Sequence, residues 1–255
     1  MKQKAQKYRQ VFLALHGKNE RQLAANIKKA IRSDFEAFWM GNITETNYDL
    51  ALLKIELKET EKVLFDFYVK AGTQWGEMVK RSINTQVKRN NPFFSELWTN
   101  YVIRYILPDL RGKITTIKNT LIADISKIIA EKLNEGVVNI SKEVLKFVNT
   151  PKFYKWKAMR IARTETTIAM NTATNQAGID SGVLIEKEWI SAGDGNERPS
   201  HRELNGDSVE LGQAFSNGLM YPGDPSGAAD EIINCRCTFL QVPVRDKNGD
   251  IIFTT

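Results

Sequence analysis

The chain has 255 residues, enough for one large domain or two modest domains that bury a core without disulfide bonds. It carries 36 lysine and arginine residues against 30 aspartate and glutamate residues, a net charge of +6. The 2 cysteines are too few for a disulfide framework, and no apolar run approaches the about 20 residues that cross a bilayer. These features exclude disulfide-stapled secreted proteins and membrane-spanning proteins, so we expect a soluble chain in a reducing cytoplasm, with no membrane partner.

The charge is unevenly distributed along the chain. Residues 1–150 hold 25 basic and 16 acidic side chains, a net charge of +9, whereas residues 151–255 hold 11 basic and 14 acidic side chains, a net charge of −3. A basic N-terminal half predicts a polyanion or an acidic partner. The alternative is a lysine-rich helical surface that faces only solvent.

Apolar residues recur at three- and four-residue steps from Asn19 to Phe147, which predicts helices through nearly all of this region. The first apolar stripe consists of Leu23, Ile27, Ala30, Ile31, Phe35 and Phe38. A second helical stretch is expected to begin at the capping residues Thr46 and Asn47 and to stop at Asn90–Pro92.

Three more helices are expected before residue 150. One runs from Phe94 to about Pro108, a long one carries apolar residues from Ile114 to Leu133, and a short one spans Ser141–Val148. Short turns between helices favour antiparallel neighbours, so this half is predicted to be an antiparallel helical region.

Thr150–Pro151 is the predicted domain boundary, because charge sign, composition and periodicity all change near it. It separates a basic helical region, 1–150, from a C-terminal module, 151–255. A helix is expected from Lys152 to about Asp180, followed by elements without helical period. These are strands at 183–190 and 235–244, a hairpin turn at 246–250 with the Asn-Gly pair that tight turns favour, and a returning strand at 251–253. The predicted fold class is α+β, with a small, loop-rich C-terminal domain and a short antiparallel sheet.

The common nucleotide and zinc-protease motifs are absent from the sequence. It contains no Walker-type loop, no G-x-G-x-x-G that opens a helix, and no H-E-x-x-H. The residue types that carry chemistry are instead concentrated between Trp189 and Cys237.

Cys235 and Cys237 are two residues apart on an expected strand, so both thiols are predicted to point to one face. A disulfide between them is disfavoured, because the alpha carbons lie at the edge of bridging geometry. Same-face thiols suit a metal, and His201 with either Asp194 or Asp224 would complete a four-ligand zinc site. Zinc is therefore the one cofactor for which the sequence offers candidate ligands.

Two other interpretations of the same residues stay open. In the first, the cysteines are small buried hydrophobic residues and His201 is a hydrogen-bonded core or loop residue. In the second, Cys237, His201 and Asp194 form a nucleophilic site, but no nucleophile elbow or glycine-rich oxyanion loop accompanies them. The sequence therefore favours no catalytic residues.

Arg163 and Glu165 lie on a predicted helix, and structural ion pairs outnumber catalytic ones. We interpret the two residues as anchors for the loops that carry Asp194 and His201.

Basic residues in the N-terminal half are candidates for nonspecific, salt-sensitive phosphate contacts. They are the pairs Lys28, Lys29 and Lys88, Arg89, with a cluster of Lys2, Lys4, Lys7 and Arg9. A solvated lysine-rich face remains the alternative.

Taken in order, the motifs between residues 155 and 243 resemble the phage Mu F-like minor head proteins of tailed bacteriophages. The residues that carry the resemblance form an ordered signature that ends in N-C-R-C: Arg163, Glu165, Trp189, Asp194, Arg198, His201, Gly206, Phe215, Pro222, Asp224, Asn234, Cys235, Arg236 and Cys237.

The resemblance implies a minor capsid component that is associated with the portal protein inside the procapsid. Its implied partners are the portal, scaffold or major capsid protein and packaged DNA, and its implied location is the virion head, after assembly in the host cytoplasm. The resemblance implies no enzymatic activity. The alternative is a metal-dependent hydrolase or an ADP-ribosyltransferase-like enzyme that uses His201, Cys235 and Cys237.

Overall fold

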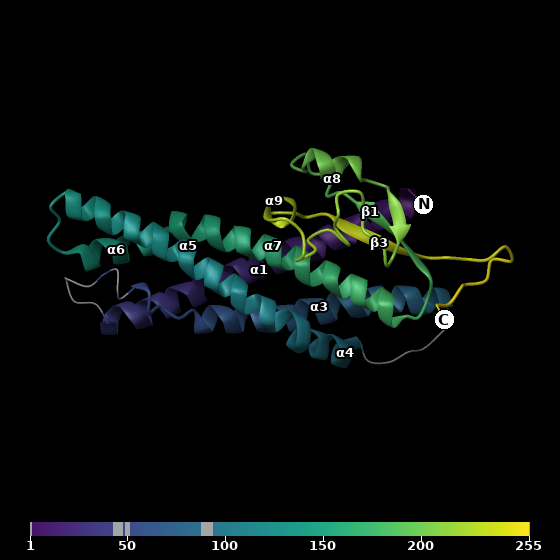
Figure 1. Cartoon of the computed structure of the whole chain (residues 1–255), viewed down its shortest axis with the longest axis horizontal. Helices are drawn as coiled ribbons and strands as arrows, with labels where there is room; N and C mark the ends of the chain where they lie inside the picture. The colour runs from purple at the N-terminus through teal and green to yellow at the C-terminus, as the bar shows by residue number, and fades with distance from the viewer. Residues whose placement is uncertain (1, 43–47, 49–51, 88–93, 255) are drawn as a thin grey trace. The chain divides into compact units, whose positions relative to one another are not determined.

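The computed structural model describes residues 2–42, 48, 52–87 and 94–254 (Figure 1). Its helices are α1 Lys2–Asn42, α3 Lys58–Val87, α4 Phe94–Tyr101, α5 Leu107–Asn134, α6 Ile140–Val148, α7 Pro151–Asp180, α8 Pro199–Glu203 and α9 Ala229–Ile232, with a π-helical segment, η1, at Val102–Ile106. Its strands are β1 Ile185–Ile190, β2 Ser208–Glu210 and β3 Thr238–Pro243. Long helices with a small antiparallel sheet confirm the α+β class. Among the described helices, none is both apolar enough and long enough to cross a bilayer.

The chain forms two compact units, and each is assembled from segments that are separated in the sequence. Unit 1 consists of residues 1–21, 68–101 and 160–255, and unit 2 consists of residues 22–67 and 102–159. Helices α1, α3 and α7 therefore each contribute one part to each unit. The boundaries between these two units differ from the predicted domain boundary at Thr150–Pro151. That predicted boundary coincides with the short turn between α6 and α7.

The first helix is longer than its apolar stripe predicts, because it starts at Lys2 and runs unbroken to Asn42. We predicted a start for the second helix that lies N-terminal to the observed one. Its expected capping residues, Thr46 and Asn47, lie outside the described residues, and the chain is not helical at 53–57. Helix α3 begins only at Lys58. Leucines at 53 and 57 continued the apolar period beyond the helix itself, which misled the prediction.

Pro108 was expected to end a helix, but it lies in the first turn of α5 instead. A proline is tolerated there, because its missing N–H would have no partner within the helix. The preceding π-helical turn, Val102–Ile106, joins α4 to α5, so the chain stays helical through this region.

Unit 2 is a helical unit with an apolar core. The predicted stripe on α1 is buried at Leu23, Ile27 and Ile31, and α5 contributes Leu121 and Ile125. The start of α3 is held by a carboxylate from another helix. Asp34 accepts hydrogen bonds from the backbone N–H groups of Glu59 (2.9 Å) and Thr60 (3.0 Å). Asp34 thus satisfies N–H groups that have no partner within α3 and places a negative charge at its N-terminus.

Helix α7 is buried on all sides within unit 1. Every residue from Thr164 to Thr174 is buried, and this stretch is made mainly of threonine, alanine and other small residues. Small side chains allow other elements to approach the helix closely from several directions. Their hydroxyl groups must then find hydrogen-bond partners, because an unpaired buried polar group is costly.

One side of α7 is bonded to the parts of α1 and α3 that belong to unit 1. The pairs are His16–Thr167 (2.9 Å), Glu20–Arg163 (2.9 Å), Trp75–Thr174 (2.8 Å), Lys80–Asp180 (2.6 Å) and Tyr68–Glu165. These contacts are polar, buried or partly buried, and distributed along the helix. They therefore fix its axial position as well as its orientation.

Close approach between α3 and α4 depends on two glycines. A β-carbon at Gly72 would lie 2.2 Å from the ring of Trp98, and one at Gly76 would lie 1.9 Å from the ring of Phe94. Both rings are fully buried. The aromatic side chains of α4 thus occupy the space that larger residues on α3 would fill.

The sheet has the strand order β2–β1–β3 and is antiparallel throughout. Trp189 of β1 is opposite Phe239 of β3, and Glu186 is opposite Glu210 of β2. Gln241 of β3 donates a hydrogen bond to the backbone carbonyl of Thr174 (2.8 Å), which attaches this edge strand to α7.

The strand predictions are partly correct. Strands β1 and β3 fall within the predicted ranges, and the hairpin is present, with isolated bridges at Arg245–Ile251 and Val183–Phe253 in place of a regular returning strand. The prediction that Cys235 and Cys237 lie on a strand is wrong, because β3 starts only at Thr238. The short strand β2 was not predicted, since three residues are too few to show alternation.

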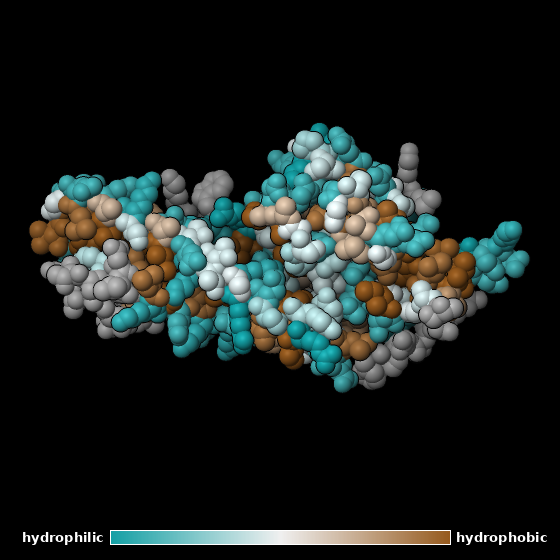
Figure 2. Space-filling model, in the orientation of Figure 1, coloured by the Kyte–Doolittle hydropathy of each residue, from teal (hydrophilic) through white to brown (hydrophobic). Residues whose placement is uncertain are grey.

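The surface combines hydrophilic and hydrophobic areas (Figure 2). Unit 2 exposes apolar side chains at the turn between α5 and α6, where Leu133 is 54% and Val138 is 87% exposed. Such residues are common on protein surfaces, so they identify no partner by themselves.

His16 gives unit 1 a specific pH dependence. Burial, together with the charges of Arg236 and Arg163, lowers the pKa of His16 to about 3. Below the ordinary pKa of histidine, the unfolded chain takes up a proton that the folded chain does not. We expect the free energy of unfolding to fall by up to about 1.4 kcal/mol per pH unit between pH 6.5 and pH 5 on account of His16.

Chemical denaturation at several pH values checks this expectation, with a His16→Gln variant as the comparison. The variant should lose stability at neutral pH but should show a shallower decline from pH 6.5 to pH 5. Since His201 is present in both proteins, its titration cancels in the difference. Equal slopes would contradict the assignment.

Candidate functional site

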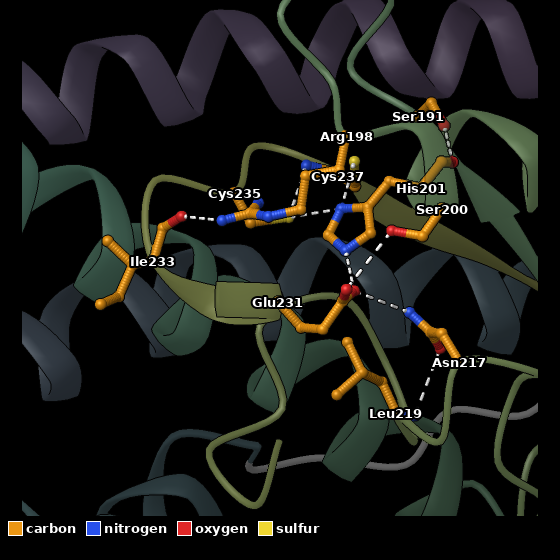
Figure 3. Close-up of polar contacts among 10 residues, drawn as sticks. All are labelled: Ser191, Arg198, Ser200, His201, Asn217, Leu219, Glu231, Ile233, Cys235 and Cys237. Carbon is orange, nitrogen blue, oxygen red and sulfur yellow. Dashed lines mark hydrogen bonds and ion pairs between the residues drawn. The ribbon is translucent and has the colours of Figure 1, made fainter. Parts of the chain in front are cut away.

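His201, Cys235 and Cys237 come together in a buried cluster within unit 1 (Figure 3). Their exposed fractions are 1%, 3% and 2%. His201 lies on the short helix α8, and the two cysteines lie on the irregular segment between α9 and β3. The cluster therefore joins two loops of the C-terminal region that are more than thirty residues apart in the sequence.

Both thiols face the same nitrogen of the imidazole. The Sγ atoms of Cys235 and Cys237 each lie 3.6 Å from Nδ1 of His201. The backbone N–H of Cys237 also donates to Sγ of Cys235 at 3.4 Å. The prediction that both thiols point to one side assumed a strand that is not there. The structure nevertheless brings both thiols to the same imidazole nitrogen.

The other imidazole nitrogen is bound by a carboxylate that the sequence analysis missed. Nε2 of His201 lies 2.8 Å from Oε2 of Glu231, on α9. Glu231 is itself contacted by Ser200 Oγ (3.4 Å) and Asn217 Nδ2 (3.4 Å). Because the carboxylate accepts a hydrogen bond from Nε2–H, the neutral imidazole presents its lone pair at Nδ1, toward the thiols.

The cluster shifts the pKa values of its members. Burial lowers the pKa of His201, but hydrogen bonds to Cys237 and Glu231 outweigh burial and raise it above the ordinary value. The hydrogen bond between the two cysteines lowers the pKa of Cys235 and raises that of Cys237, and burial adds to the second effect. One thiol is thus predisposed to ionise before the other.

Helix α7 supports the cysteine segment through its buried polar side chains. Thr167 donates to the carbonyl of Cys235 and accepts from Nε2 of His16, while Thr164 accepts from the backbone N–H of Asn234 (3.0 Å). Asn171 donates to the carbonyls of Cys237 (2.9 Å) and Pro222 (2.8 Å) and accepts from Thr238 Oγ1 (2.8 Å). The backbone around both cysteines is therefore fixed by α7.

Apolar side chains enclose the cluster from the other side. The two cysteines pack in one core with Trp189, Leu204, Phe215 and Leu219. The Trp189 ring meets the rings of His201 and Phe215 edge to face, each with a centroid separation of 5.1 Å. A dry environment of this kind strengthens electrostatic interactions inside it.

Lys187 is a buried cation beside this core. Its Nζ donates to the carbonyls of Leu211 (2.9 Å) and Met220 (2.6 Å) and lies 5.3 Å from the centroid of the Phe215 ring. Burial lowers the pKa of Lys187 to about 8. The ammonium group thus holds the 211–220 loop to β1.

The two aspartates predicted as fourth metal ligands do not belong to the cluster of metal-binding atoms found in the described residues. Asp194 is exposed and pairs with Arg236 at 2.6 Å. Asp224 is buried and accepts hydrogen bonds from the backbone of Met220 (2.9 Å) and from Ser226. Both carboxylates stabilise their own loops, so the prediction of a fourth ligand from this pair is not supported by the geometry.

The interpretation of Arg163 and Glu165 as anchors of the loops at 194 and 201 is wrong. Arg163 pairs with Glu20 of α1, and Glu165 accepts a hydrogen bond from Tyr68 of α3. The spacing of the two residues correctly indicated ion pairing, but it did not show which face of the helix each would occupy.

Two further signature residues meet backbone requirements. Asn234 has a φ of 61°, a left-handed conformation that asparagine tolerates better than most residues, and Gly206 has a φ of 95°. The N–H of Gly206 donates to the carbonyl of Trp189 at 2.8 Å. Arg198 donates to the carbonyl of Ile233 at 2.6 Å. The signature therefore consists largely of residues that shape and connect loops.

The predicted phosphate-contacting residues are not members of this cluster. Lys28 and Lys29 are exposed on the part of α1 that belongs to unit 2, whereas Lys88 and Arg89 lie outside the described residues. In the N-terminal cluster, Lys4 and Lys7 are exposed, Arg9 is half-buried near Gly193, and the side chain of Lys2 lies outside the described part.

The chemistry available to the cluster is limited by its burial. Cys235, His201 and Glu231 are ordered like a nucleophile, base and orienting acid, but the thiols are almost fully shielded from solvent. Asp194, the acid expected for that arrangement, is not part of it. A closed group of two thiols and one imidazole is better suited to holding loops together or to holding an ion.

A family model described as "Phage Mu protein F like protein" matches residues 123–240. This region belongs to the phage Mu F-like family. The matched range includes α7, strands β1 and β2, the buried cluster and the N-C-R-C segment, and it ends within β3. It confirms the resemblance drawn from the signature and connects the Mu F-like region with bacteriophage head morphogenesis.

Two curated proteins are similar over a longer stretch. One, from Enterococcus faecalis, is named NAD(+)--arginine ADP-ribosyltransferase EFV and is 26% identical over 207 residues, which is 75% of this chain and 41% of that protein. The other, the uncharacterized protein YqbB of Bacillus subtilis, is 23% identical over 72% of this chain and 61% of its own length. The chain thus spans less than two thirds of either relative. No solved structure matches it.

Glu231 and Asn171 are the main site residues that the sequence analysis missed. Glu231 is one of several acidic residues, and its sequence position gave no sign that it would face His201. Asn171 had a weak signal: a polar residue inside the apolar stretch Ile168–Ala173 of a predicted helix. Such a residue is either exposed or, as here, bonded to backbone from another segment.

We expect an Asn171→Ala substitution to lower the free energy of unfolding by about 3 kcal/mol, because it removes three buried hydrogen bonds and leaves carbonyl groups unpaired. The matched control is Asn175→Ala, one turn further along α7, where Oδ1 has no hydrogen-bond partner among the described residues. Urea denaturation of both variants measures the difference. Equal losses would show that α7 does not hold the cysteine segment in the way described.

Proposed function

We propose that this chain is a minor head protein of a bacteriophage that acts in procapsid assembly next to the portal. The observation that carries this proposal is the phage Mu F-like match over residues 123–240. In the proposal, the protein works inside the head, after assembly in the host cytoplasm, and its other contacts are with scaffold or major capsid protein.

The state of the buried cluster supports a role in assembly over one in catalysis. His201, Cys235 and Cys237 are at most 3% exposed, and their neighbours are loop-forming and core residues. Catalytic side chains need access to a substrate, whereas a docking module needs a rigid shape. We therefore propose that the chain is not an enzyme and that its signature residues maintain the module that meets its partners.

The similarity to an ADP-ribosyltransferase favours one specific alternative. That activity is named for the Enterococcus faecalis protein, and this chain spans 41% of its length. An enzyme that uses the His201, Cys235 and Cys237 cluster, either as a transferase or as a metal-dependent hydrolase, is the corresponding second candidate. It would require the cluster to open, since the cluster is closed to solvent.

Co-expression with the portal protein of the same phage tests the assembly role. We expect the two proteins to co-purify at low and at moderate salt, with a portal-only preparation as the control for nonspecific retention. Omission of this chain should reduce the yield of DNA-filled heads in cells.

Absence of the complex at both salt concentrations would contradict the portal contact. Transfer of ADP-ribose from NAD⁺ to arginine by the purified wild-type chain would contradict the nonenzymatic role. That activity should then be lost in a His201→Ala variant whose near-ultraviolet circular dichroism shows a folded protein.

We also propose that the basic N-terminal half, residues 1–150, contacts packaged DNA, with Lys28 and Lys29 among the contacting residues. The net charge of +9 in residues 1–150 and the exposure of Lys28 and Lys29 support this contact. Phosphate contacts of this kind depend strongly on salt, because each one releases condensed counterions.

For a double variant, Lys28→Gln with Lys29→Gln, we expect the slope of log affinity against log salt concentration to become shallower by about 1.8 on duplex DNA. The control is Lys247→Gln, an exposed lysine in the C-terminal hairpin, which should leave the slope unchanged. Fluorescence anisotropy with a labelled duplex measures both. Salt-independent binding by the wild type would rule out the contact.

A further inference from the structure

The arrangement of the two thiols around one imidazole nitrogen does not fit hydrogen bonding alone. A neutral imidazole has a single lone pair, and the contact of Nε2 with Glu231 places that lone pair on Nδ1. Nδ1 can therefore accept one S–H group, yet both Sγ atoms lie 3.6 Å from it. The hydrogen bond between the two cysteines gives the second thiol a partner, but it does not require both sulfur atoms to lie at the same distance from Nδ1.

A shared metal ion accounts for both distances. Zinc binds thiolate sulfur at about 2.3 Å and imidazole nitrogen at about 2.0–2.1 Å in tetrahedral geometry, which sets the sulfur and the nitrogen about 3.6 Å apart. The three donor atoms of His201, Cys235 and Cys237 all lie within 4.8 Å of one another. An ion could bind between them with little movement of the backbone.

The charges around the cluster also suit a divalent ion. Two thiolates, one neutral imidazole and one Zn²⁺ sum to zero, and a neutral centre is what a site with at most 3% exposure can hold at low cost. Soft thiolate ligands with imidazole favour zinc over magnesium or calcium.

The surroundings of the ligands match those of a metal site. Metal-bound histidines usually donate a hydrogen bond from their second N–H to a carboxylate. Here the carboxylate of Glu231 accepts a hydrogen bond from Nε2 of His201 at 2.8 Å. The N–H of Cys237 donates to Sγ of Cys235, which stabilises negative charge on that sulfur. The hydrogen bonds from Thr167 and Asn171 fix the backbone of both cysteines before any ion arrives.

We infer that His201, Cys235 and Cys237 bind one zinc ion that joins α8 to the segment before β3, with Glu231 as the positioning residue for the imidazole. On binding, each thiol releases its proton to solvent as its sulfur–zinc bond forms, and Nδ1 donates its lone pair. Asp194 and Asp224 are not ligands. Three protein ligands leave the fourth tetrahedral position to a water molecule, and the site is independent of the proposed role in head assembly.

Metal analysis of the untagged, full-length protein tests this inference. The protein is purified in reducing buffer without chelators, and we expect one zinc ion per chain by inductively coupled plasma mass spectrometry. Replacement of zinc by Co²⁺ should produce the thiolate-to-cobalt charge-transfer bands and the intense d–d bands of a tetrahedral centre. Removal of the ion by a strong chelator should lower the midpoint temperature of unfolding.

Variants assign the ligands. Cys235→Ser and Cys237→Ser should each lose the zinc, whereas Asp194→Asn, at an exposed carboxylate of the same region, should retain one ion per chain. Glu231→Gln should retain the ion with an affinity that is 10- to 100-fold weaker, measured by competition with a chromogenic chelator.

Folded, reduced wild-type protein that contains no zinc and shows no cobalt bands would overturn the inference. Full zinc occupancy in both cysteine variants would overturn the ligand assignment, and loss of zinc in Asp194→Asn would restore that carboxylate as a ligand. If the serine variants do not fold, the cobalt spectrum of the wild-type protein decides, because thiolate charge-transfer bands require cysteine ligands.

Discussion

The packing of unit 1 depends on the complete burial of the middle of α7. A helix that is buried on all sides usually carries apolar residues on every face. The stretch Thr164–Thr174 instead carries several hydroxyl and amide groups. Several of these groups, among them Thr167 and Asn171, are bonded to other segments, since water cannot reach them, whereas Thr166 Oγ1 has no hydrogen-bond partner among the described residues. The positions of α1, α3 and the cysteine segment therefore all follow from the same helix.

This constraint connects the two sides of unit 1 physically. His16 donates to Thr167, and Thr167 donates to the carbonyl of Cys235, so a single hydroxyl group joins α1 to the N-C-R-C segment. Asn171 does the same for Cys237 and β3. The cysteine segment is irregular in structure, but it is held as firmly as a strand would be. Rigidity of this kind suits the proposed role, in which the protein presents a defined surface to other head components.

Much of the fold could be predicted from the sequence because it depends on local periodicity. The apolar stripe at Leu23, Ile27 and Ile31 and the Asn-Gly turn at 248–249 are local signals, and both appear where expected. The interleaving of the two units could not be predicted in this way. Periodicity shows which face of a helix is buried but not which other segment covers it.

The same limit applies to the site. Residue type and spacing were enough to bring together Cys235, Cys237 and His201, because reactive residues are rare in this chain. They could not show that Glu231 would be the carboxylate beside His201. The chain offers 30 acidic residues, and only the path of the loop that carries α9 selects one of them.

The interleaved assembly of unit 1 has a consequence for how the protein is made. Its first twenty-one residues belong to the same unit as residues 160–255, which are synthesised much later. Phe12 and His16 must therefore stay unpartnered by α7 until that helix has been synthesised. Contacts that are so distant in the chain form slowly, and exposed apolar segments are prone to aggregate in the meantime. If the protein acts in head assembly as proposed, early encounter with another head component would shorten that vulnerable interval and would couple completion of the fold to entry into the growing particle.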